Sequence, residues 1–123
     1  MRLSQDLQSL LLSSIDPVAA VRVLVVFHGD PLRSWTLAEM TTRLGLSVMA
    51  ASNAFIDLGG HDFVSPAPSS EAFRLRPMPQ PTSALLDALR QALAEDASVV
   101  ARAIGERSCA RLRALTSSFT HRI

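Results

Sequence analysis

Signals for the start and end of helices constrain the fold of this chain most strongly. Thr36 and Glu39 have the spacing of a capping box, in which each side chain accepts a hydrogen bond from the other residue's backbone N–H. Gly45 follows as a residue that ends helices, and Ser47 is a second N-cap. The sequence therefore predicts two helices joined by a tight turn, over residues 36–44 and 48–58.

Two further helices are predicted before this pair. The first covers residues 4–15 and carries apolar residues at helical spacing along one side: Leu7, Leu10, Leu11 and Ile15. The second begins at Asp16 and Pro17, an N-cap and a first-turn proline, and extends to Gly29. This second helix is apolar almost all round, which is typical of a buried helix.

A small hairpin is predicted after the helix over residues 48–58. The core-facing apolar residues of this helix are expected to be Val48, Ala51, Phe55 and Leu58, and two glycines end the helix. Residues 63–64 and 73–76 then have strand character on either side of a turn-rich loop. Because side chains alternate along a strand, Arg74 and Arg76 point the same way, away from the core.

The C-terminal part changes composition to Ala, Leu and Arg after a proline-rich connector. A helical segment is predicted from Ser83, and Asp96 divides it from a helix over residues 97–119. That last helix would be about 35 Å long at about 1.5 Å per residue. Its apolar stripe predicts contact with a second copy of the chain, and the alternative is packing on residues 4–15 of the same chain. The stripe includes Leu112, Leu115 and Phe119.

The order of these elements resembles the winged helix-turn-helix domain of bacterial transcriptional regulators. The carriers are residues 35–47, WTLAEMTTRLGLS, which are similar to the family's turn between two helices. The expected fold is mainly α, with a three-helix core, a small β-hairpin wing, an N-terminal helix and a long C-terminal helical segment. The expected organisation is an N-terminal helix, a winged helix-turn-helix and a dimerisation segment, over residues 1–15, 16–78 and 79–123.

The resemblance implies a cytoplasmic DNA-binding transcriptional regulator that acts as a homodimer and reads double-stranded DNA with residues 48–58. The residues that it places at DNA are Ser47, Ser52, Asn53, Arg74 and Arg76. The sequence departs from this expectation in its charge. No cation lies between Arg43 and Arg74, and residues 1–78 carry six arginines against seven acids. Phosphate binding, which supplies much of the affinity for DNA, needs cations.

The helix over residues 48–58 therefore has a second interpretation. Met49 and Ile56 lie opposite its predicted core face, and such side chains suit contact with another protein. The alternative hypothesis is a winged-helix module for protein–protein interaction with weak or no DNA binding. If the helix is rotated, both residues belong to the core instead.

Other function classes find little support in the sequence. We expect no enzyme, because no nucleophile elbow, phosphate-binding loop or pair of carboxylates is recognisable. We expect no cofactor and no metal, because the three histidines lack helical pairing and Cys109 is the only cysteine. Cys109 is interpreted as a buried side chain or, less simply, as a redox-sensing thiol. The longest apolar stretch is far too short for a membrane span.

Overall fold

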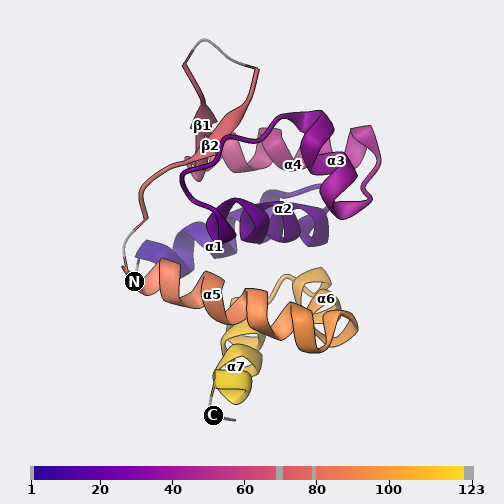
Figure 1. Ribbon diagram of the computed structural model, residues 1–123. Coiled ribbons are helices and arrows are strands. Elements are labelled where there is room, and N and C mark those ends of the chain that lie inside the picture. The colour runs from indigo at the N-terminus through magenta and orange to yellow at the C-terminus, as the bar shows by residue number, and fades with distance from the viewer. Residues whose placement is uncertain (1, 69–70, 79, 121–123) are drawn as a thin grey trace.

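A computed structural model describes residues 2–68, 71–78 and 80–120 of the chain (Figure 1). It is mainly helical with one small antiparallel sheet, which confirms the predicted class. The elements in chain order are α1 (Arg2–Ser13), α2 (Pro17–Gly29), α3 (Leu37–Leu44), α4 (Val48–Gly60), β1 (Val64–Pro66), β2 (Phe73–Leu75), α5 (Gln80–Glu95), α6 (Ala97–Gly105) and α7 (Cys109–Thr120).

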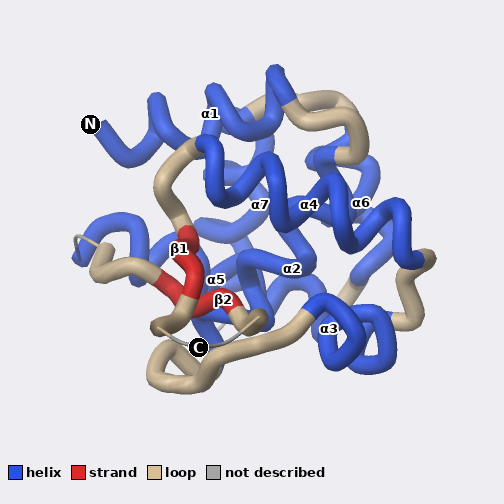
Figure 2. Tube along the Cα trace, turned by 90° about the horizontal axis from the view of Figure 1, so that it is seen from above, coloured by secondary structure: helices blue, strands red, loops and turns tan. Residues whose placement is uncertain are grey.

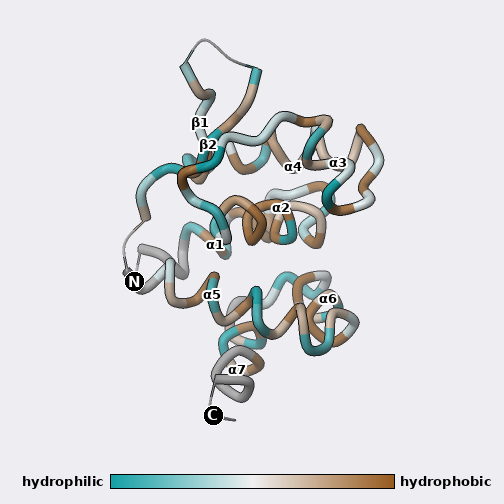
Figure 3. The backbone as a smooth tube through the Cα atoms, viewed as in Figure 1, coloured by the Kyte–Doolittle hydropathy of each residue, from teal (hydrophilic) through white to brown (hydrophobic). Residues whose placement is uncertain are grey.

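Helix α2 lies at the centre of the molecule. Figure 1 shows α3, α4 and the hairpin on one side of it and α5, α6 and α7 on the other. It packs against both α4 and α5, and Figure 3 colours much of its backbone as hydrophobic. Eight of its thirteen residues are buried, as the sequence predicts for a helix that is apolar all round. Seen from above (Figure 2), α1 and α3 lie on opposite sides of α4.

The corner between α3 and α4 forms as the local signals predict. The Thr36 backbone N–H donates to Glu39 Oε1 over 2.9 Å, and the Glu39 N–H donates to Thr36 Oγ1 over 3.1 Å. Gly45 has a φ of 67°, a conformation that costs a residue without a side chain little. Arg22 of α2 donates to the Leu44 carbonyl over 3.2 Å and so satisfies a free group at the end of α3.

The hairpin is held to the helices by its second strand. Strand β2 pairs with β1 in the register Val64↔Leu75, which confirms a hairpin with bounds shifted by one or two residues. On its other edge, Phe73 exchanges two backbone hydrogen bonds of 2.8 Å with Trp35, the residue just before α3. The ring of Phe73 packs edge-on against Phe55 of α4, with 5.2 Å between centroids. The hairpin is therefore attached at two places, to the start of α3 through Trp35 and to the core face of α4 through Phe55.

The prediction of one long helix over residues 97–119 is wrong, because the helix is interrupted between α6 and α7. Arg107 has a φ of 58°, in the left-handed region, and its guanidinium donates to the carbonyls of Leu11 and Leu12 at 3.0 Å each. Ser108 then starts a new helix by accepting a hydrogen bond from the Arg111 N–H over 3.1 Å. The break thus lets one arginine satisfy the free carbonyls at the end of α1.

Three smaller expectations also need correction. Helix α5 begins at Gln80 rather than near Ser83, since proline is tolerated in a first helical turn. Ile15 is 74% exposed because α1 ends at Ser13, so this residue leaves the helical face. Val48, expected in the core, is 66% exposed because the first turn of α4 borders a hollow beside α3.

Candidate functional site

Helix α4 carries three of the seven exposed large apolar side chains of the described residues. Met49 is 75% exposed, Ile56 68% and Val48 66%, while the opposite side of the helix is buried. That buried side consists of Ala51, Ala54, Phe55 and Leu58. The structure therefore confirms that Met49 and Ile56 face solvent, and the alternative in which both belong to the core is wrong.

The polar residues expected to contact DNA from α4 offer few free groups. The Ser47 hydroxyl caps the helix by accepting a hydrogen bond from the Ala50 N–H over 3.1 Å. Ser52 and Asn53 are half-buried beside the apolar face. None of the three is charged, so α4 supplies no cation for phosphate, in line with the charge pattern of the sequence.

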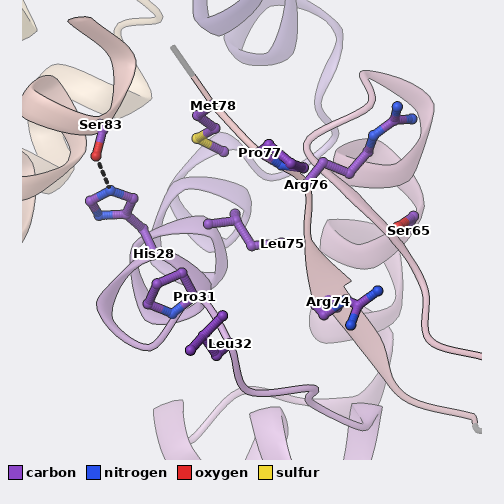
Figure 4. Close-up of a pocket in the computed structure, with 10 residues that line it drawn as sticks. All are labelled: His28, Pro31, Leu32, Ser65, Arg74, Leu75, Arg76, Pro77, Met78 and Ser83. Carbon is purple, nitrogen blue, oxygen red and sulfur yellow. Dashed lines mark hydrogen bonds between the residues drawn. The ribbon is translucent and has the colours of Figure 1, made fainter. Parts of the chain in front are cut away.

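The two hairpin arginines lie where the strand alternation predicts. Figure 4 shows both side chains leaving β2 and its extension on the same side, and both residues are exposed. Arg76 pairs with Asp62 at 3.4 Å. The side chain of Arg74 makes no hydrogen bond or ion pair within the described part of the chain. The structure thus leaves Arg74 available and partly neutralises Arg76.

A second group of charges surrounds Trp35. The guanidinium of Arg33 lies 3.7 Å from the centroid of the Trp35 ring and pairs with Glu39 at 3.4 Å. The backbone hydrogen bond from Thr36 lowers the pKa of Glu39, because it stabilises the charged carboxylate. Arg43, exposed in the last turn of α3, makes no ion pair within residues 2–68, 71–78 and 80–120. Among the cations near α4 and the hairpin, Arg43 and Arg74 are therefore unpaired.

A hydroxyl, an imidazole and a carboxylate meet where α2 ends and α5 begins. The Ser83 hydroxyl lies 2.8 Å from His28 Nε2 (Figure 4). Asp87 Oδ1 lies 3.5 Å from His28 Nδ1. A catalytic triad would need the carboxylate within hydrogen-bond reach, about 2.6–3.2 Å. The Asp87 side chain is instead 57% exposed, and its carboxylate also forms an ion pair with Arg90 at 3.4 Å. The group connects two helices, and sequence reasoning missed it because its members are far apart in the chain.

The residues expected at a dimer interface differ in exposure. Leu112 is fully buried and belongs to the core of the chain itself, where α7 packs against α5, α6 and α1. Leu115 is half-buried against this core. The side chains of Phe119 and Cys109 lie outside the described residues. The predicted alternative named only residues 4–15 as the partner within the same chain, whereas α7 also packs against α5 and α6.

In comparisons with known proteins, no family model, curated protein or solved structure matches this chain.

The described residues hold no group of three or more His, Cys, Asp or Glu side chains that could bind a metal ion. None of their helices has both the length and the apolar run that a bilayer crossing requires.

Proposed function

We propose that this chain is a non-enzymatic winged helix-turn-helix regulator that binds DNA as a homodimer in the cytoplasm. The observation that carries the proposal is the α3–α4 corner followed by a hairpin that Trp35 holds beside it. In this arrangement the outer face of the second helix enters the major groove and the hairpin lies along the backbone. Ser52 and Asn53 are then the base-reading candidates, with asparagine suited to adenine.

Phosphate contacts fall to Arg43 and Arg74 because α4 itself carries no cation. One copy of the chain offers these two unpaired arginines, and a dimer offers four. The logarithm of DNA affinity falls with the logarithm of salt concentration by about 0.9 per neutralised phosphate. Binding as a dimer predicts a slope of about −3.6, and binding as a monomer predicts about −1.8.

The first prediction concerns Arg74→Ala in a duplex-DNA titration over a salt series. The slope for a dimer is expected to move from about −3.6 to about −1.8, because two phosphate contacts disappear. Fluorescence anisotropy of a labelled duplex measures it. Arg102→Ala is the matched control, since this exposed arginine lies in the last turn of α6 on the far side of α2, and its slope stays unchanged. Absence of binding at low salt would refute the proposal.

The exposed apolar side chains of α4 favour a second candidate function, binding of another protein. Met49 and Ile56 are seven residues apart and share one face of the helix, with Val48 beside Met49. DNA offers such side chains little beyond thymine methyl groups. A protein partner would cover them, which is the ordinary reason for an exposed apolar patch.

The second prediction tests this face with Met49→Glu and Ile56→Glu. Each variant is expected to abolish capture of a partner protein from a cell lysate while leaving the melting temperature nearly unchanged, because both positions are exposed. Leu12→Glu is the control, since Leu12 is also exposed (58%) but lies on α1. Unchanged capture by both α4 variants would contradict the second candidate function. Loss of salt-dependent DNA binding in both variants would instead indicate that this face of α4 contacts DNA.

A further inference from the structure

A pocket of about 410 Å³ lies between the hairpin, the turn after α2 and the start of α5 (Figure 4). This volume falls within the range of about 300–1,000 Å³ that is usual for small-molecule sites. Three segments that are distant in the sequence form its walls, so the pocket is a product of the tertiary fold. It is separate from the outer face of α4, which contributes no residue to its walls.

The side of the hairpin that faces α5 carries no guanidinium group. Side chains alternate along a strand, so Leu75 points to one face of the hairpin while Arg74 and Arg76 point to the other. Figure 4 shows both guanidinium groups and Ser65 on the outer face, and Leu75 on the side of His28. The space between Leu75 and His28 therefore lacks an arginine head group that could pair with an anion.

Apolar side chains line most of this space. Leu32 is 90% exposed, the largest exposed fraction among the large apolar side chains of the described residues. Leu75 and Met78 are half-buried, so part of each side chain is open to a ligand. The remaining apolar wall consists of Pro31 and Pro77. Covering such surface removes it from water, which favours a ligand with an apolar body.

A hydrogen-bonded pair, His28 and Ser83, supplies the polar groups at the end of the pocket beside α5 (Figure 4). The Asp87 carboxylate lies 3.5 Å from His28 Nδ1, and its charge favours the neutral ring with hydrogen on Nδ1. Nε2 then accepts the hydrogen bond of 2.8 Å that the Ser83 hydroxyl donates. The Ser83 oxygen has used its one hydrogen in this bond but keeps lone pairs, so it offers a ligand an acceptor.

We propose that this pocket binds a small, uncharged, hydrophobic alcohol. The alcohol donates a hydrogen bond to Ser83 Oγ, and its hydrocarbon part lies on Leu32, Leu75 and Met78. An ether has no hydrogen to donate to this acceptor, and an ionised carboxylate has none either and brings a charge that the walls do not pair. The inference does not depend on the proposed DNA binding, because it rests on the pocket alone.

1-Octanol is the probe, and the full-length protein without DNA is titrated with it by isothermal titration calorimetry. A ligand of this size is expected to bind with a Kd on the order of 0.1–1 mM. Methyl heptyl ether and octanoate have similar length but cannot donate, and each is expected to bind about tenfold more weakly. Absence of heat with 1-octanol, or equal or tighter binding of either comparison compound, would overturn the assignment to alcohols.

The methyl resonances of the methionines locate the bound alcohol by NMR. The Met78 signal is expected to shift on addition of 1-octanol, because this side chain lines the pocket. Met40 is fully buried in the core and Met49 is 75% exposed on α4, and both signals should stay unchanged. Met49 is the control for adsorption to any exposed apolar side chain. A Met49 shift equal to that of Met78, or an unshifted Met78 signal, would overturn the site.

Substitution of Leu32 tests the apolar wall. Leu32→Glu is expected to weaken 1-octanol at least tenfold, because it places a charge on this wall at an exposed position without disturbing the core. Leu12→Glu changes an exposed leucine that is not among the lining residues, and it leaves the Kd unchanged. Equal binding by Leu32→Glu and the unmodified chain would overturn the site.

Substitution of Ser83 tests the acceptor. Ser83→Val puts a methyl group in place of the hydroxyl and is expected to equalise the affinities for 1-octanol and methyl heptyl ether. Ser83→Thr retains the hydroxyl and the roughly tenfold preference for the alcohol. The ratio is measured within one variant, so a general change of the pocket does not mimic the result. A preference that persists in Ser83→Val would overturn the role of Ser83. Because no DNA is present, failure here leaves the salt titration of the proposed function unaffected.

Discussion

Replacing Phe27 by alanine is expected to lower the free energy of unfolding by about 3–5 kcal/mol. Phe27 is fully buried near the end of α2, and its ring centroid lies 5.6 Å from that of Phe55 on α4. Phe55 in turn contacts Phe73 of the hairpin. The loss combines the transfer of the ring from water with the cavity that it leaves between helices and hairpin.

Urea denaturation followed by circular dichroism measures this loss. Phe27→Leu retains most of the volume and is expected to lose clearly less free energy than Phe27→Ala. Leu12→Ala, at an exposed position, is the surface control and should change the free energy of unfolding by less than about 0.5 kcal/mol. A loss below about 1 kcal/mol for Phe27→Ala would contradict the central position of this ring.

The α3–α4 corner could be predicted from the sequence because its determinants are local. Thr36, Glu39, Gly45 and Ser47 act on backbone groups within four residues of themselves, so their effects do not depend on the rest of the fold. The exposed face of α4 was predictable for a similar reason. Helical periodicity alone places Met49 and Ile56 on the side of α4 that faces away from its core residues.

The contacts that assemble these elements could not be predicted in the same way. Ser83 bonds His28 across 55 positions of the chain, and Arg107 reaches Leu11 across 96. The helical and strand periodicities of the sequence do not indicate which residues of distant elements come into contact. The same limit applies to the candidate site: strand alternation predicted the exposure of Arg74 and Arg76, whereas the pairing of Arg76 with Asp62 and the pocket under the hairpin come from the tertiary fold.

The break between α6 and α7 shows how a regular apolar stripe can mislead. Residues on both sides of the break, such as Ile104 and Leu112, face the same core, so their spacing resembles that of one helix. Gly105 and Ser108 carry the signal that was missed, since glycine and serine favour the end and the start of helices. A shorter α7 also leaves less surface for a second copy than one helix about 35 Å long.

Replacing Trp35 by alanine is the second substitution with a large expected effect, a loss of about 3–5 kcal/mol in the free energy of unfolding. Trp35 is 5% exposed, and its backbone bridges to Phe73 while Arg33 covers its ring. Alanine keeps the backbone groups but removes the indole that fixes them beside the hairpin. The loss therefore acts at the attachment of β2 to the start of α3.

Trp35→Phe is the informative comparison because the indole Nε1 is buried and has no hydrogen-bond partner within the described residues. Phenylalanine removes this unsatisfied donor, which offsets part of the lost volume, so its cost should be well below that of alanine. Hydrogen exchange adds a local measurement. The Phe73 N–H, which donates to the Trp35 carbonyl over 2.8 Å, should exchange faster in Trp35→Ala relative to the amides of α2. Equal acceleration throughout the chain would mean that the indole stabilises the whole core and does not specifically hold the hairpin.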